Sequence, residues 1–126
     1  MIVLDSSGWV EVLTRGPLAE RFRARLEDAE VVLVPTIILY EVYKVVYRER
    51  SEQDALAAAA RLRRHDVVPL SAHLALEAAD ASMRHRLPMA DAIVYATAQV
   101  YEALLVTGDV HFAGLPGVEY IPLEGE

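Results

Sequence analysis

The sequence predicts an α/β fold in which a short, mostly parallel sheet is covered on both faces by helices. Short apolar runs alternate with longer amphipathic segments along the whole chain, as in parallel strands joined by crossover helices. Hydrophobic residues make up 54% of the 126 residues, which predicts a packed core instead of disorder. At this length we expect one domain over residues 1–126.

Five short segments are predicted to be strands. Each is rich in Val, Ile or Leu and too short to form a buried helix. They are Ile2–Asp5, Val31–Val34, Asp66–Leu70, Leu104–Thr107 and Val118–Ile121.

The helices of the first half are predicted from their start signals. Ser6 or Ser7 is expected to cap the helix after the first strand. Pro17 suits the first turn of a second helix. Thr36 is expected to cap a long helix that ends at about Arg50.

Three further helices are predicted in the second half. Ser51–Asp54 resembles a capping box and opens an Ala-rich helix to about Arg64. Ser71 is expected to cap a helix that reaches about Arg86, and Pro88 to begin the next one.

The charge and the missing residue types narrow the class of protein. With 12 basic and 19 acidic residues the formal net charge is −7. This argues against a protein that coats nucleic acid by neutralising phosphates, although it permits a nuclease whose acidity is offset by bound cations. The chain has no cysteine, and no apolar run reaches the ~18 residues that span a bilayer. We expect no signal peptide and a cytoplasmic location.

Four carboxylates occur where strands end or helices begin. Asp5 ends the first strand, Asp91 opens a helix and Asp109 follows a strand, while Glu41 lies in the apolar segment Ile37–Tyr47. In an open α/β sheet such positions face one crevice. Clustered carboxylates repel unless a cation neutralises them, and an all-oxygen set suits Mg²⁺ or Mn²⁺.

Each acid also has a simpler explanation. Asp5 could be a helix N-cap, and Asp109 a turn residue. Asp91 could be ordinary charge placement at a helix N-terminus, where the dipole stabilises its anionic form. Glu41 could pair with Lys44 three residues later. The joint occurrence of all four acids favours a common site.

At these residues the chain resembles the PIN domain family and, within it, the VapC-type toxins of toxin–antitoxin pairs. The resemblance covers the whole chain, and its third segment is the most specific. The matching segments are Ile2–Ser7, Tyr40–Val42, Leu87–Ala98 and Leu105–Phe112.

The resemblance implies a three-layer α/β/α fold and a metal-dependent endoribonuclease that uses Mg²⁺ or Mn²⁺. It also implies RNA cleavage by metal-activated water, leaving a 5′-phosphate and a 3′-hydroxyl, as well as homodimers and inhibition by a cognate antitoxin. The catalytic and metal-binding acids of the family carry over onto Asp5, Glu41, Asp91 and Asp109. Its supporting hydroxyl residues carry over onto Ser6 or Ser7 and Thr107.

The histidines are predicted to have no role in the chemistry. His65, His73, His85 and His111 show no spacing typical of metal ligands, so we expect surface or packing positions for all four. His111, two residues after Asp109, is nearest to the predicted site.

Other functions fit less well. A haloacid-dehalogenase-type phosphatase needs a second Asp two positions after the first, where this chain has Ser7. A response-regulator receiver needs a late Lys, and Lys44 is the only lysine. The alternative that stays open is a catalytically inactive PIN-like module that binds another protein.

The segment Ile37–Tyr47 also predicts a partner surface. Glu41 and Lys44 are its only charged residues, and a helix that is apolar all round is buried on all sides. We expect its outer face, with Tyr43 and Tyr47 as anchors, to contact a second subunit, an antitoxin, or both. The alternative is that the following helix covers this face.

Overall fold

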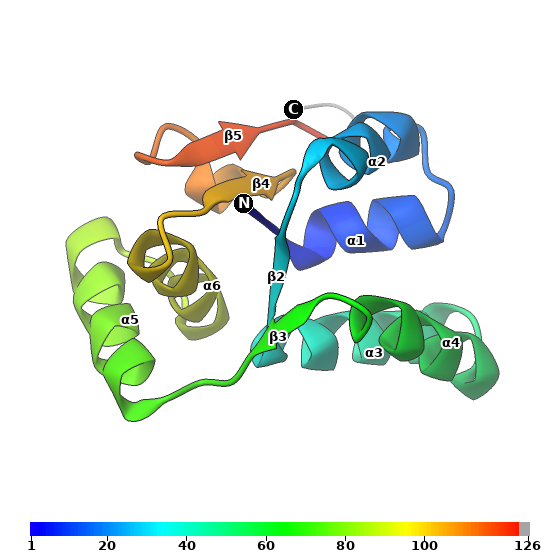
Figure 1. Ribbon diagram of the computed structural model, residues 1–126, viewed down its shortest axis with the longest axis horizontal. Coiled ribbons are helices and arrows are strands. Elements are labelled where there is room, and N and C mark those ends of the chain that lie inside the picture. Colours follow the sequence, from blue (N-terminus) through cyan, green and yellow to red (C-terminus); the bar gives the residue numbers. More distant parts are fainter. Residues whose placement is uncertain (124–126) are drawn as a thin grey trace.

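The computed structural model describes residues 1–123, so the last three residues of the predicted domain lie outside the described part. Its centre is a five-stranded sheet in which every pair of neighbours is parallel (Figure 1). This confirms the predicted α/β fold with a parallel sheet. In spatial order the strands are β3 (Asp66–Val68), β2 (Val32–Pro35), β1 (Ile2–Leu4), β4 (Leu104–Thr107) and β5 (Val118–Tyr120).

Helices cover both faces of this sheet. Figure 1 shows α5 and α6 on one side and the other four α-helices on the opposite side, which gives the predicted three layers. Within the described residues, no helix combines the length and apolarity needed to cross a membrane. The helices are α1 (Ser6–Leu13), α2 (Ala19–Asp28), α3 (Thr36–Glu49), α4 (Glu52–Leu62), α5 (Ala72–His85), α6 (Met89–Val100) and the 3₁₀ helix η1 (Val110–Phe112).

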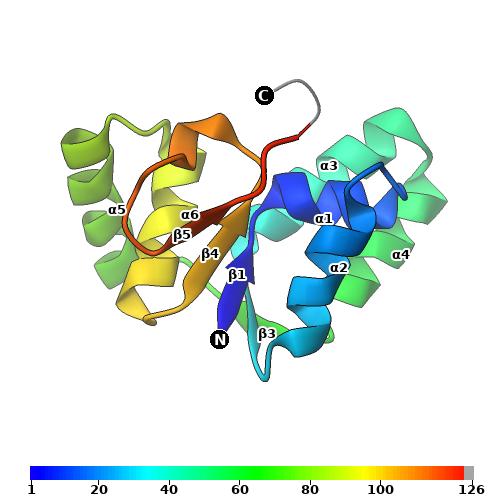
Figure 2. The same cartoon turned by 90° about the horizontal axis from the view of Figure 1, so that it is seen from above.

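The order of the strands places the crevice. The chain runs outward from β1 through β2 to β3 and then returns to add β4 on the other side of β1. In such sheets the crevice opens at the carboxyl ends of the strands that flank this reversal. Figure 2 shows β1 and β4 side by side, running from the end that holds the N-terminus toward the end at which α1 begins.

The elements around this crevice are anchored by buried side chains. Val3 on β1 pairs in register with Leu33 and Leu105 of the adjacent strands, and all three are buried. Phe112, fully buried, fixes the turn after β4. The carboxyl ends of β1 and β4 are therefore packed against the hydrophobic core.

Two predicted caps are correct and two are wrong. The Ser51 and Ser71 hydroxyls accept hydrogen bonds from backbone amides three residues later, at 3.0 and 3.1 Å. Ser6 and Thr36, in contrast, are already the first helical residues. The cap positions are occupied by Asp5, which follows β1, and by Pro35, the last residue of β2.

The second helix begins later than predicted. The structure starts α2 at Ala19, with Pro17 in the preceding turn. The Glu11 carboxylate accepts a 2.7 Å hydrogen bond from the Leu18 amide. This bond between the end of α1 and the turn stabilises the turn before the helix begins.

Candidate functional site

Asp5 directly follows β1, at the carboxyl end of this central strand. Its backbone amide donates to the Val106 carbonyl at 2.9 Å, which continues the pairing of β1 with β4. Its side chain is buried and makes no cap hydrogen bond with α1, although the residue occupies the N-cap position. Instead, Oδ2 accepts hydrogen bonds from Thr107 Oγ1 at 2.9 Å and Ser7 Oγ at 3.1 Å. Simple capping therefore does not explain this acid.

The two hydroxyls that hold Asp5 are themselves oriented by the backbone after β4. The Gly108 amide donates to Ser7 Oγ at 3.0 Å, and the Asp109 amide donates to Thr107 Oγ1 at 2.9 Å. Because each hydroxyl accepts one of these bonds, its single proton is available for the carboxylate. This network joins residues about a hundred positions apart in the sequence.

Burial raises the pKa of Asp5 to about 6, against the hydrogen bonds from Thr107 and Ser7, which lower it. Removing a carboxylate from water disfavours its charged form. Here the effect of burial is larger than the stabilisation of the charged form by the hydrogen bonds from the two hydroxyls. The pKa shows that the charge of Asp5 is only partly compensated in the protein alone.

Glu41 reaches the same site from α3. Burial and, to a smaller extent, the negative charges of Asp5, Asp91 and Asp109 raise its pKa to about 7, against a hydrogen bond from Ser6 that lowers it. These charge interactions place Glu41 in the neighbourhood of the other three acids, although the tight group of ligand atoms described below does not include Asp5 or Glu41.

The simpler explanation for Glu41 was a pair with Lys44. In the described structure Lys44 instead donates to the Tyr40 hydroxyl at 3.3 Å and lies over the Tyr40 ring. The sequence left open whether Ser6 or Ser7 supports the acids. In the structure both do: Ser6 forms a hydrogen bond with Glu41, and Ser7 donates one to Asp5.

Asp91 and Asp109 form the outer part of the site. Asp91 lies in the first turn of α6, and Asp109 follows β4 and caps η1, accepting the His111 amide at 2.9 Å. His111 Nδ1 lies 2.9 Å from Asp91 Oδ2 and 3.3 Å from Asp109 Oδ1. Ligand atoms of these three residues all lie within 4.8 Å of one another.

The charges of this outer group are coupled. Burial and the nearby Asp109 raise the pKa of Asp91, even though His111 lowers it. Partial burial and a like charge therefore disfavour the anionic form of Asp91, whose position in the first turn of α6 favours it. In return, Asp109 and Asp91 raise the pKa of His111.

His111, the histidine expected to lie nearest to the predicted site, is a surface residue that also contacts two of the acids. The other three lie elsewhere in the described structure: His65 packs on Trp9, His85 on Tyr95, and His73 is exposed on α5. The only sequence signal for His111 was its position two residues after Asp109, because its contact with Asp91 bridges twenty residues.

The donor set fits a divalent cation. The site gathers carboxylate oxygens with raised pKa values and no arginine or lysine partner among the interactions of the described residues. A hard divalent cation prefers such oxygen ligands and would compensate their charge. This is the residue chemistry that the sequence predicted.

A sequence model of the PIN domain matches residues 2–118, nearly the whole chain. The chain belongs to the PIN domain family. The curated proteins contain no match to it.

Solved structures of toxin–antitoxin proteins share this PIN fold. A toxin–antitoxin complex from Klebsiella pneumoniae is 23% identical with a TM-score of 0.80, covering 98% of this chain and 100% of that one. VapC20 from Mycobacterium tuberculosis, described as a sarcin–ricin loop cleaving toxin, is 20% identical with a TM-score of 0.78, covering 98% of both chains. VapBC2 from Rickettsia felis, bound to a promoter DNA fragment, is 17% identical with a TM-score of 0.77, covering 95% and 98%.

Proposed function

We propose that this PIN domain is a metal-dependent endoribonuclease that acts in the cytoplasm as the toxin of a toxin–antitoxin pair. The observation that carries the proposal is the gathering of acids from separate segments in a PIN domain. Ligand atoms of Asp91 and Asp109 lie within 4.8 Å of one another, and Asp5 is held beside them by Ser7 and Thr107. RNA as substrate is supported by the described activity of VapC20, and an antitoxin by the complexes among the similar structures.

In this proposal four carboxylates would hold one or two Mg²⁺ or Mn²⁺ ions, directly or through water. A bound ion lowers the pKa of water and stabilises charge on phosphate oxygens. The four proposed ligands are Asp5, Glu41, Asp91 and Asp109.

The neighbouring residues keep these groups in place. Ser7 and Thr107 fix the buried carboxylate of Asp5, so its free oxygen keeps one orientation without reorganisation during the reaction. Asp91 and Asp109 are only partly buried, which leaves the outer part of the site accessible to a phosphodiester. In this proposal Asp5 anchors the bound ion, and Asp91 and Asp109 lie on the side that meets the substrate.

Incubation of total RNA with the purified protein tests the activity. We expect cleavage with Mn²⁺ or Mg²⁺, none with EDTA, and 5′-phosphate and 3′-hydroxyl ends when the products are sequenced. A protein that binds its partner but cuts no RNA under any of these conditions would be the inactive binding module.

A groove between α3 and α4 supports an antitoxin partner. Its volume is about 760 Å³, and its lining is almost entirely apolar. The following helix thus packs on α3 without covering its outer face, since Tyr40 and Tyr47 stay exposed. The residues lining the groove are Leu39, Tyr40, Tyr43, Lys44, Tyr47, Arg48, Ala59 and Arg63.

The rim of this groove indicates the chemistry of the occupant. Lys44, Arg48 and Arg63 surround an apolar floor to which Tyr43 contributes a half-buried ring. We propose that an amphipathic antitoxin segment fills the groove, with apolar side chains against the tyrosines and acidic ones at the rim.

Tyr47→Glu is expected to weaken antitoxin binding by at least about tenfold, because it places a negative charge on the apolar wall. Cleavage of RNA by the free protein should not change. Tyr101→Glu is the matched control, since Tyr101 is 44% exposed where Tyr47 is 48% exposed, and lies outside the groove. Binding is measured by calorimetry with the antitoxin encoded beside the toxin gene; equal affinities of both variants would contradict this assignment.

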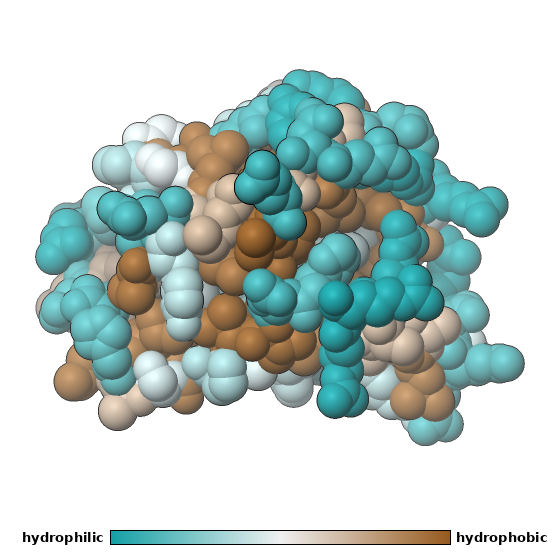
Figure 3. All heavy atoms as spheres, in the orientation of Figure 1, coloured by the Kyte–Doolittle hydropathy of each residue, from teal (hydrophilic) through white to brown (hydrophobic). Residues whose placement is uncertain are grey.

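The predicted homodimer remains a proposal, supported by a second apolar surface. Leu76 and Met83, two turns apart on α5, are 71% and 84% exposed. Figure 3 shows apolar side chains spread across the middle of one face of the molecule. Sedimentation should give a dimer for the wild type and a monomer for Met83→Glu; a wild type that stays monomeric at high concentration would contradict the dimer.

A further inference from the structure

His111 is a site residue outside the set of four acids. Its Nδ1 atom faces Asp91 Oδ2 at 2.9 Å and Asp109 Oδ1 at 3.3 Å, while more than half of the side chain is exposed. Nδ1 is thus turned toward the site, and the other part of the ring reaches solvent.

The placement of this imidazole is built into the backbone. Asp109 caps η1 through the His111 amide at 2.9 Å, so the two residues share one short turn. The next residue, Phe112, is fully buried and ties the turn to the core. Asp91 lies on a different element, the first turn of α6. The contact between the His111 ring and the Asp91 carboxylate therefore depends on how α6 packs beside this turn.

The separations between these atoms match those between ligands of one cation. In octahedral coordination with bonds of about 2.1 Å, adjacent ligand atoms lie about 3.0 Å apart. The distances from His111 Nδ1 to the two carboxylate oxygens, 2.9 and 3.3 Å, fall around that value. The third distance in the group also stays within 4.8 Å.

We propose that His111 is a nitrogen ligand, through Nδ1, of a divalent cation that it shares with Asp91 and Asp109. This inference rests on the proposed metal-dependent function and adds a residue to its site. A nitrogen ligand binds Mn²⁺ and later transition metals better than Mg²⁺, which prefers oxygen. The protein therefore favours Mn²⁺ over Mg²⁺ at this position.

A different role for His111 makes a different prediction. If the imidazole only neutralised the two carboxylates as a hydrogen-bonded cation, a metal ion would compete with it. Removing the ring would then strengthen the binding of Mg²⁺ and Mn²⁺ alike. As a ligand, its removal must weaken binding, and the loss must be larger for Mn²⁺.

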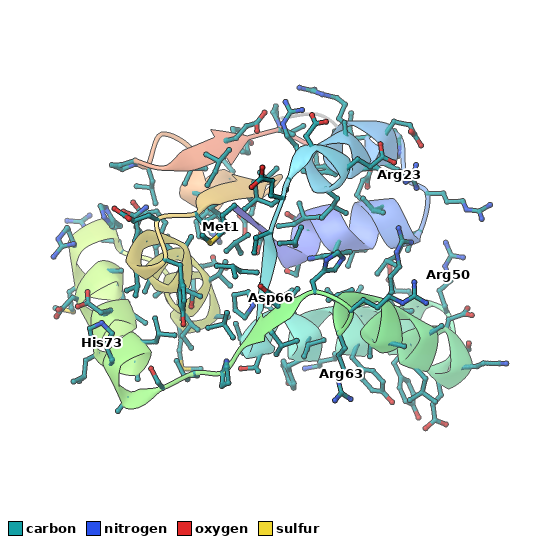
Figure 4. The ribbon with its side chains drawn as sticks, viewed as in Figure 1. Met1, Arg23, Arg50, Arg63, Asp66 and His73 are labelled. Carbon is teal, nitrogen blue, oxygen red and sulfur yellow. The ribbon has the colours of Figure 1, made fainter. Side chains whose placement is uncertain are left out.

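Electron spin-echo envelope modulation of the Mn²⁺-loaded protein tests the contact directly, without any activity measurement. We expect coupling of the Mn²⁺ electron spin to a directly bound nitrogen, and a changed pattern when only histidine carries ¹⁵N. This isotope arm uses the unaltered protein, so it does not depend on how a variant folds. His111→Ala should lose the coupling, and His73→Ala should keep it. His73, labelled on α5 in Figure 4, is an exposed histidine on another element.

Calorimetry with Mn²⁺ and Mg²⁺ on the same proteins completes the test. His111→Ala should lower the affinity for Mn²⁺ about tenfold or more and that for Mg²⁺ less than about threefold. Tight Mn²⁺ binding without nitrogen coupling, or stronger binding of both ions by His111→Ala, would overturn the ligand role while the metal-dependent function stands. Absence of any Mn²⁺ binding at millimolar concentration would remove the metal site itself.

Discussion

Asp91→Asn is expected to lower RNA cleavage by about 1,000-fold, in the range seen when one group that stabilises reacting charge is removed. The amide keeps the size of the side chain but not the negative charge that would hold a cation. Asp91 is only half-buried, in the first turn of α6, so the fold does not depend on it. Asp5→Asn should be equally inactive, because Asp5 is the buried acid of the site.

The control for this experiment is Asp66→Asn. Asp66, labelled in Figure 4, is exposed and is the first residue of β3, so it lies at the opposite end of this parallel strand from its carboxyl end. Initial rates with a labelled RNA in Mg²⁺ should be normal for this variant, and circular dichroism should show the same fold for all three. Full activity of the Asp91→Asn protein would show that the site lies elsewhere.

The metal-free protein is expected to be more stable at pH 5 than at pH 8. The folded state raises the pKa of Asp5 to about 6 and of Glu41 to about 7, from ordinary values of 3.8 and 4.5. A raised pKa means that the folded protein holds these protons more tightly than the unfolded chain does. The stability they contribute is present below the ordinary values and is lost as the pH rises through about 6 and 7. Glu119, whose pKa Arg25 lowers, contributes in the opposite sense only at more acidic pH.

Mn²⁺ should reverse this loss at pH 8. A ligand bound only by the folded state at about 100 times its Kd adds about 2.7 kcal/mol, which raises Tm by on the order of 10 °C for a domain of this size. The rise should be smaller at pH 5, where the carboxyl groups hold protons. Differential scanning calorimetry at both pH values, with and without Mn²⁺, measures each effect.

Variants of Asp5 distinguish the effect of pH on Tm from the effect of Mn²⁺ on Tm. Asp5→Asn keeps an oxygen that can accept hydrogen bonds from Ser7 and Thr107 but never ionises, so the metal-free variant should have a higher Tm than the wild type at pH 8. In Asp5→Ala the rise in Tm caused by Mn²⁺ should shrink. A metal-free protein with the same Tm at pH 5 and pH 8, and no response to millimolar Mn²⁺, would contradict a strained acidic site.

Much of the fold follows from local patterns. Short runs such as Val31–Val34 and Leu104–Thr107 are too short for buried helices, and their alternation with helical segments favours parallel strands. The positions of Asp5 and Asp109 at strand ends then predicted a shared crevice, because the carboxyl ends of parallel strands meet at one edge of the sheet. The serine caps at Ser51 and Ser71 were also readable, since a cap depends on the next three residues only.

The rest was decided by tertiary packing. Sequence spacing could not place His111 against Asp91, because that contact depends on how α6 packs beside the turn after β4. Nor could it show that the hydroxyls of Ser7 and Thr107 hold Asp5, because this requires β1 and β4 to be neighbours. The sequence by itself determined which residue types stand at the edge of the sheet. Only the packed structure set the distances between their atoms and their burial, and the energies of charges and hydrogen bonds depend on both.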